Sequence, residues 1–167
     1  MKRKMIIAVV VLLAGITGWC LHHYSDREVI KRTLSSIAVA LGKEGEESPI
    51  QLALKMRPVK DFIAPACKVN VPESNYHELL DPELVIRYLI IYRSRQAKLQ
   101  VAIDGIQVDI PGKGSAEVSA LVHVTANQNQ HDFFDEVHQV NFSLQKQKKK
   151  WQLHQATLPA DALVHGH

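Results

Sequence analysis

The second half of the chain alternates between apolar and polar residues, as strands do. The alternation starts near Ala97, and its apolar positions change parity at Asp104-Gly105. A glycine at such a phase break indicates a bulge or bend, so we expect one long bent strand here. Three more alternating segments follow at 115–124, 134–144 and 151–158. Together they predict four long strands in an antiparallel meander.

The first half has helical spacing at two places. Ser25, with Glu28 three residues later, forms a capping box before an amphipathic helix, and Gly42 supplies a stop signal. Asp81-Pro82 begins another helix that runs to about Arg95. The latter is apolar over so much of its surface that we expect it to be largely covered.

The segment between these two helices contains three prolines that matter for its structure. Ser48-Pro49 opens a further short helix, which Pro58 is expected to end. Pro65 then interrupts the β-like stretch 60–71, so we expect an edge strand or two short pieces there.

Helices grouped before an antiparallel run predict an α+β fold. The bent sheet must wrap on the three helices, which leaves a cone with an apolar interior and one open end. We divide the chain into an N-terminal segment, 1–24, one domain, 25–160, and a short tail, 161–167.

The N-terminal segment predicts a membrane anchor. "MKRK" precedes an uncharged apolar run from Met5 to Leu21, which as a helix is about 26 Å long and can span a bilayer. The basic start should keep the N-terminus in the cytoplasm and the domain outside it. A cleaved signal peptide is the alternative, which would release the domain into the periplasm. Trp19 argues against lipidation at Cys20.

Charge narrows the possible partners. Lys2, Arg3 and Lys4 account for the whole formal charge of +3, so the rest of the chain is neutral. This argues against nucleic-acid binding, and we interpret the basic cluster at 146–150 as a solvated hairpin tip. Cys20 lies in the predicted anchor and Cys67 in the domain, so we expect no disulfide between them. No spacing of cysteines and histidines resembles a zinc site. We expect no metal and no cofactor.

This order of elements resembles the nuclear transport factor 2-like family, a cystatin-like α+β cone shared with ketosteroid isomerases and polyketide cyclases. The resemblance rests on the capped helix after Ser25, the "KDFIAP" strand, the Asp81-Pro82 helix, the bend at Asp104-Gly105 and the ending "VNFSLQKQKKKWQLHQATL". Membrane-anchored members look most similar overall, including the periplasmic assembly component of type IV secretion systems. The resemblance thus implies a scaffold or adaptor outside the inner membrane.

The same family implies a second possibility, an acid or base inside the cone. The segment "HDFFDEVHQVNFSL" places Glu136 and His138 at the same parity as its core residues. Asp104, Tyr88 and Tyr92 are further pocket candidates, by analogy with isomerases that use a carboxylate and a tyrosine. The alternative is structural: Glu136 and His138 mark the mouth of the cone, where the core meets water.

We therefore expect a single-pass bacterial inner-membrane protein with a non-enzymatic binding or assembly domain in the periplasm. Leu121 is an apolar residue on the otherwise polar outer face of the sheet, and it is our candidate for a homodimer contact. The alternative function is binding or isomerisation of a small apolar ligand by Glu136, His138 and Asp104.

Overall fold

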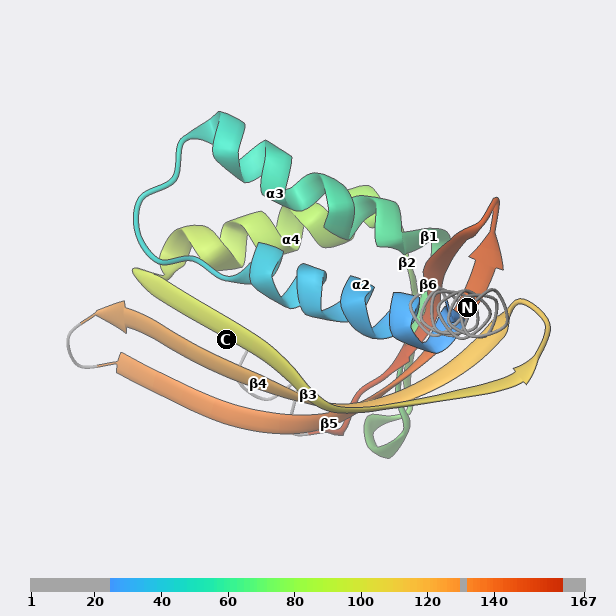
Figure 1. The fold of residues 1–167 in the computed structure, drawn as a ribbon. Coiled ribbons are helices and arrows are strands. Elements are labelled where there is room, and N and C mark those ends of the chain that lie inside the picture. Colours follow the sequence, from blue (N-terminus) through green and yellow to red (C-terminus); the bar gives the residue numbers. More distant parts are fainter. Residues whose placement is uncertain (1–24, 130–131, 161–167) are drawn as a thin grey trace, which may run out of the picture.

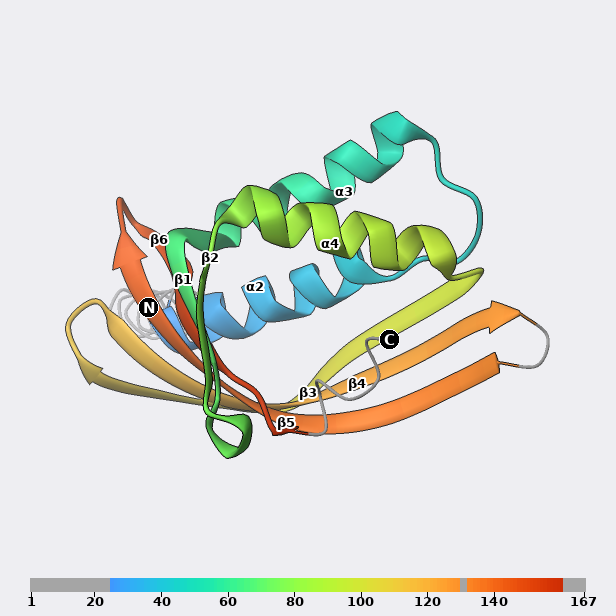
Figure 2. The same ribbon diagram turned by 180° about the vertical axis from the view of Figure 1, so that it is seen from behind.

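The computed structural model describes residues 25–129 and 132–160, which form three α-helices and six strands (Figure 1). In chain order they are α2 (Asp26–Leu41), α3 (Pro49–Phe62), β1 (Ile63–Val71), a 3₁₀ turn (Pro72–Ser74), β2 (Tyr76–Leu80), α4 (Pro82–Arg95), β3 (Lys98–Gly112), β4 (Ser115–Asn129), β5 (Asp132–Gln147) and β6 (Lys150–Thr157). The strands form one bent sheet in the order β2-β1-β6-β5-β4-β3. The described helices lie together over its concave side (Figures 1 and 2). The predicted α+β architecture is confirmed.

The predicted meander and its bend are also present. β3, β4, β5 and β6 pair antiparallel in sequence order. The β3–β4 register shifts between Asp104 and Gln107, and Gly105 has φ +60° there. An L-residue rarely adopts this conformation, so the glycine in the sequence is the physical cause of the bend.

α2 begins and ends where predicted, but only the Ser25 half of the predicted capping box is formed, and Gly42 acts for a different reason. The Ser25 hydroxyl accepts a hydrogen bond from the Glu28 amide at 3.4 Å, while the Glu28 carboxylate pairs with Lys31. Gly42 has an extended backbone with φ −65°, not the left-handed conformation of many helix stops. A Cβ at Gly42 would lie 3.3 Å from the Val39 carbonyl oxygen, a tight contact, so the close backbone approach favours glycine there.

Two predictions about the prolines were wrong. Pro58 lies inside α3, and the helix continues to Phe62 because Val59 and Phe62 are buried after it. Such burial offsets the single hydrogen bond that a proline removes. Nor is the strand containing Pro65 an edge: β1 lies between β2 and β6. Its parallel pairing with β6 is irregular between Ile63 and Lys68, which accommodates the proline.

The prediction that the Asp81-Pro82 helix is largely covered was also wrong. Asp81 caps α4 as expected, accepting from the Glu83 amide at 2.7 Å. Only Ile86 and Arg93 of this helix are buried, however, and Tyr88 is 60 % exposed. No described helix is long and apolar enough to span a membrane, and the predicted anchor at 5–21 lies outside the described residues.

The core lies between the helices and the part of the sheet nearest to the β5–β6 hairpin. Its buried members come from every layer: Ile30, Leu34, Ile37, Met56, Val59, Phe62, Ile86, Val118, Leu144 and Trp151. Trp151 is 4 % exposed and faces inward, as its parity in the last strand predicts. The opposite half of the concave face is only partly buried, which leaves its polar residues accessible to water.

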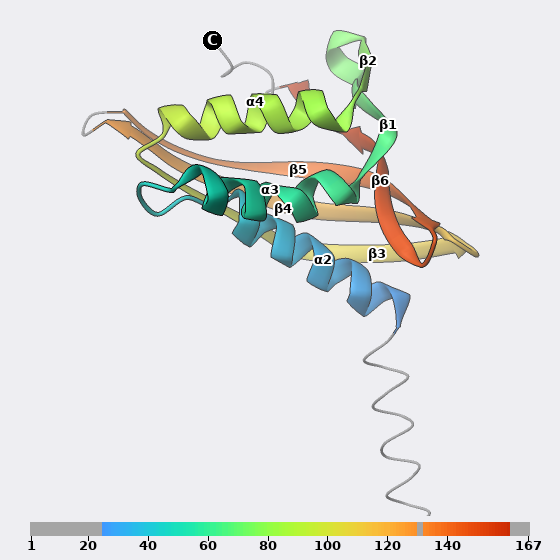
Figure 3. The ribbon, with the colours of Figure 1, turned by 90° about the horizontal axis from the view of Figure 1, so that it is seen from above.

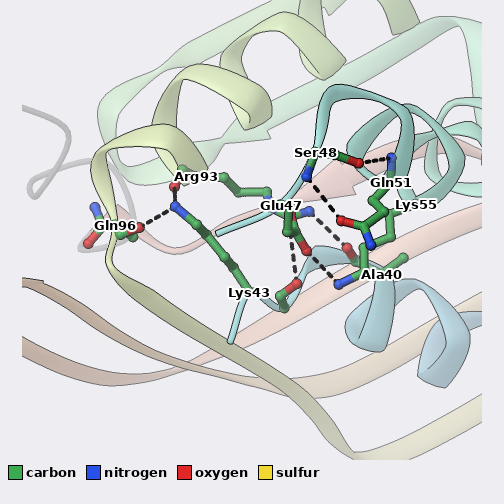
Figure 4. A network of polar contacts seen from close by, with 9 residues as sticks. Ala40, Lys43, Glu47, Ser48, Gln51, Lys55, Arg93 and Gln96 are labelled. Carbon is green, nitrogen blue, oxygen red and sulfur yellow. Dashed lines mark hydrogen bonds and ion pairs between the residues drawn. The ribbon is translucent and has the colours of Figure 1, made fainter. Parts of the chain in front are cut away.

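A buried arginine joins the three described helices (Figure 4). Arg93 of α4 is 2 % exposed and donates to the carbonyl oxygens of Ala40 at 3.0 Å and Gly42 at 2.9 Å. It also pairs with the Glu47 carboxylate at 2.6 Å. Lys55 of α3 pairs with the other oxygen of Glu47, again at 2.6 Å. Thus one guanidinium satisfies carbonyls at the end of α2 and holds the α2–α3 loop.

The pKa of Glu47 reflects this arrangement. Desolvation acts to raise the pKa of this carboxyl, but the hydrogen bond from Lys55 and the charge of Arg93 outweigh it and lower the pKa below the ordinary value of 4.5. The carboxylate therefore stabilises the fold above about pH 4.5, and this stabilisation is lost as the pH falls through the lowered pKa.

We expect Glu47→Gln to lower the free energy of unfolding by about 2–4 kcal/mol at pH 7, because it leaves the buried Arg93 charge without its anion. The loss should shrink as the pH falls below about 4.5, when the native Glu47 is itself protonated. Urea unfolding followed by circular dichroism measures both effects. Glu46→Gln is the control, because Glu46 is exposed in the same loop. Equal midpoints for the two variants would contradict the role of Glu47.

Candidate functional site

Glu136 and His138 lie together on the concave face of the sheet. The β4–β5 register places them opposite Val124 and Val122, both inward-facing residues. The pairing of β4 with β5 continues without a register shift from Asn127–Phe133 to Ser115–Gln145, so no bulge turns Glu136 outward. His138 Nε2 lies 2.7 Å from Glu136 Oε2, and the two side chains are 13 % and 23 % exposed. The pair is thus partly desolvated and still accessible to water.

Tyr92 reaches this pair from α4. Burial raises the pKa of its phenol, and the negative charge of Glu136 raises it further. The second effect shows that Glu136 acts on the phenol across the gap between α4 and β5. The Tyr92 phenol is neutral and lies within electrostatic range of Glu136, and Tyr92 is 40 % exposed. The Glu136–His138 pair is able to exchange a proton with a polar atom of a bound ligand, and Tyr92 is a further hydroxyl on the facing helix.

The structure separates the other two pocket candidates from this cluster. Asp104 is exposed and pairs in register with Leu121, on the convex face of the sheet. Tyr88 lies one turn before Tyr92 on α4 but is 60 % exposed. The cluster is therefore Glu136, His138 and Tyr92. Asp104 immediately precedes Gly105, which has the left-handed φ of +60° at the bend of β3.

A second polar cluster, which the sequence did not indicate, lies on the opposite face. His123 Nε2 lies 2.5 Å from Asp135 Oδ1 and 3.5 Å from the Thr125 hydroxyl. A cleft of about 840 Å³ lies beside it, between the α2–α3 loop and β3, and includes His123, Thr125 and Lys55 in its wall. Both contacts of His123 use the same ring nitrogen, so the arrangement is not a proton relay of the kind that activates a hydroxyl nucleophile.

The remaining reactive side chain is a thiol. Cys67 is buried, and burial raises its pKa to about 11. A thiol that is protonated at neutral pH is a poor nucleophile and a poor metal ligand. Within the described ranges, no three His, Cys, Asp or Glu side chains are grouped so that they could hold a metal ion.

No protein-family model and no curated protein matches the chain. Solved structures do. An NTF2-like protein with a cystatin-like fold from Novosphingobium aromaticivorans matches with a TM-score of 0.62 at 11 % identity, covering 90 % of each chain. A candidate scytalone dehydratase from the same organism has a TM-score of 0.62 at 13 % identity, covering 78 % of this chain and 80 % of its own. A candidate NTF2-like dehydratase from Streptomyces avermitilis has a TM-score of 0.60 at 10 % identity, covering 80 % and 95 %.

The chain has the nuclear transport factor 2-like fold. The fold that the sequence resemblance implied is therefore confirmed. At these identities the likeness concerns the fold alone, and function must be argued from the residues of this chain. Within an NTF2-like cone, the concave face carries Glu136, His138 and Tyr92, and the convex face carries Asp104, Leu121 and His123.

We expect Glu136→Gln to lower the pKa of Tyr92 while leaving it above that of a free tyrosine, because only the burial effect then persists. Titration of the ¹³Cζ resonances of labelled tyrosines measures the change, and Tyr92→Phe assigns the signal. Asp104→Asn removes a carboxylate from the opposite face and should leave the Tyr92 pKa unchanged. An equal response to both variants would show that Glu136 and Tyr92 do not form one cluster.

Proposed function

We propose that this protein is a membrane-anchored binding or assembly domain of a bacterial envelope complex, without a reaction of its own. The observation that carries the proposal is the convex face of the sheet, which no described helix covers (Figure 1). Three large apolar side chains are exposed on it: Leu121 at 43 %, Val137 at 56 % and Phe133 at 68 %. Apolar side chains grouped on a bare sheet face are typical of a protein–protein contact.

The strand register brings two of these residues together. Leu121 is opposite Gln139, and Val137 is opposite His123, so Leu121 and Val137 are diagonal neighbours on one face. On its other side Leu121 lies next to Gly105 of β3: a Cβ built at Gly105 would be 3.8 Å from the Leu121 Cδ1 atom. Leu121 therefore covers the bend of β3 and lies beside Val137, at one end of the row of exposed apolar residues that continues to Phe133. The partner is a second copy of the chain or another envelope protein.

The place of the domain is proposed from the sequence. The apolar run 5–21 is the anchor, and the basic residues before it keep the N-terminus in the cytoplasm. The domain is then presented on the periplasmic side of the inner membrane. The resemblance to membrane-anchored family members, such as the periplasmic assembly component of type IV secretion systems, supports this location.

If the convex face is the contact, Leu121→Arg should weaken self-association by about tenfold or more, because a charge would be buried in an apolar contact. Light scattering coupled to size-exclusion chromatography on the full chain in detergent measures the mass. Leu79→Arg is the control, since Leu79 is 63 % exposed on β2 and lies far along the sheet. An oligomer that survives Leu121→Arg would count against a homodimer through this face.

The contact between Glu136 and His138 favours a second candidate function. A carboxylate and an imidazole 2.7 Å apart, beside the neutral phenol of Tyr92, can bind a polar atom of a small apolar ligand or move a proton on it. Two of the structural neighbours are candidate dehydratases. The partly buried aliphatic residues around the pair would contact the rest of such a ligand.

Native mass spectrometry on the full chain, extracted gently from its own membranes, separates the two functions. A constant small added mass that disappears in Glu136→Gln would establish the ligand site, because that change removes the carboxylate and keeps the shape. If the protein has the assembly function, Glu136→Gln should leave the measured masses unchanged apart from the substitution. The spectrum should then show a stoichiometric protein companion, or a dimer without added mass. Asp104→Asn is the matched control for loss of a carboxylate.

A further inference from the structure

The turn between β5 and β6 presents lysines where lysine is conformationally unfavourable. Gln147 pairs with Lys150, and the two residues between them, Lys148 and Lys149, have φ +47° and +69°. Two-residue turns with both φ values positive normally use asparagine and glycine. Lys148, Lys149 and Lys150 are all exposed. The turn therefore keeps two positive charges at its tip, although other residues would form it more easily.

This turn is fixed to the beginning of α2. Lys146 Nζ lies 2.5 Å from Asp26 Oδ1, and the indole Nε1 of Trp151 donates to the same oxygen at 3.3 Å. Lys146 also lies over the Trp151 ring, 5.6 Å from its centroid. Asp26 follows the helix cap Ser25 directly. Figure 3 shows the β5–β6 hairpin and the first turn of α2 at the same end of the molecule.

The first turn of α2 is also the part of the domain nearest to the proposed anchor in sequence. The apolar run ends at Leu21, and four peptide links lead from there to Ser25. An extended chain of that length reaches at most about 14 Å. A domain anchored through residues 5–21 therefore holds its α2 start, and with it the β5–β6 turn, close to the bilayer surface.

More positive charge gathers at the same end. The Lys146 amide donates to the Gly114 carbonyl at 2.8 Å, which brings the β3–β4 turn and its exposed Lys113 beside the hairpin. Arg27 is exposed on the first turn of α2. Of the acidic groups there, Asp26 pairs with Lys146 and Glu28 with Lys31, while Asp109 and Glu117 lie opposite each other beside the β3–β4 turn.

The far end of α2 carries exposed charges of both signs: Arg95 and Lys98 lie there, together with acidic residues of the loop. Glu44 and Glu46 are exposed in the loop that follows α2. The helix has 16 residues, so the two ends lie about 24 Å apart. The exposed lysines of the β5–β6 turn lie at the end of α2 beside the proposed anchor, where an anionic membrane surface would attract them.

We propose that the basic end of the domain binds anionic phospholipid headgroups and so orients the domain on its membrane. The basic end comprises Arg27, Lys113, Lys148, Lys149 and Lys150. The proposal rests on the anchor of the proposed function and adds a lipid specificity to it. Lysines near an anionic surface act additively, and together with an anchor they fix a peripheral domain in one orientation.

The full chain is tested in nanodiscs of phosphatidylcholine, alone or mixed with phosphatidylglycerol. A fluorophore is attached at Gln147→Cys beside the turn, in a Cys20→Ala background; buried Cys67 has a pKa of about 11 and does not compete for the label. The second label position is Gly45→Cys in the acidic loop, where a side chain meets no atom within 4 Å. Phospholipids with a nitroxide headgroup then quench whichever label lies at the surface.

We expect strong quenching at position 147 only with phosphatidylglycerol, its loss at high salt, and none at position 45. Lys148→Asn with Lys149→Gly removes two charges and suits the positive φ values, so the hairpin stays folded. This variant should lower the docking equilibrium roughly 30-fold. The matched control, Arg95→Gln with Lys98→Gln, removes two charges near the other end of α2 and should quench like the native chain.

Quenching that is equal in phosphatidylcholine alone, or that persists in the hairpin variant, would overturn the proposal. So would the absence of quenching at position 147, as expected if the lysines dock an acidic protein. Flotation of the full chain with vesicles after alkaline carbonate tests the anchor separately. If the chain floats but its label is not quenched, the anchor is supported and the headgroup-binding proposal is wrong. A chain released by salt or carbonate yet dependent on phosphatidylglycerol lacks the anchor and retains headgroup binding.

Discussion

The position of the helices on the sheet depends on the burial of one charge. The Arg93 guanidinium is almost fully removed from water, so each of its hydrogen bonds must be met within the protein. Ala40, Gly42 and Glu47 accept from its two terminal nitrogens, from the end of α2 and the loop before α3, and only its Nε is left without a partner among the described residues. An ion pair of this kind contributes little net stability, but it is costly to break. Its effect is to allow one arrangement of α2, α3 and α4.

That arrangement decides which side of α4 faces the sheet. With Ile86 and Arg93 directed inward, Tyr92 lies at the side of the helix from which it interacts with Glu136, and Tyr88 faces water. The side of α4 on which Tyr92 lies follows from this orientation of the helix, whereas Glu136 and His138 are placed by the β4–β5 register. The convex face is also independent of α4, because its residues are placed by the β4–β5 register alone.

The two faces and the two ends of the molecule have different chemical character. The concave face has a partly desolvated acid–imidazole pair, and the convex face has exposed apolar side chains. The hairpin end is basic and is attached to the start of α2, while the loop after α2 is acidic. The sheet face that no described helix covers (Figure 1) is the one that the proposed assembly function would use.

Local patterns in the sequence determined the meander, the bend at Gly105, the capped start of α2 and the shared face of Glu136 and His138. These features depend on residues near one another in the chain, whose periodicity and backbone preferences act directly. Tertiary structure decided the rest. Pro58 is inside a helix because Val59 and Phe62 are buried beyond it, and β1 is internal because β2 pairs along its other side. The Arg93 network, the His123–Asp135 contact and the approach of Tyr92 to Glu136 join residues far apart in sequence, and only packing brings them together.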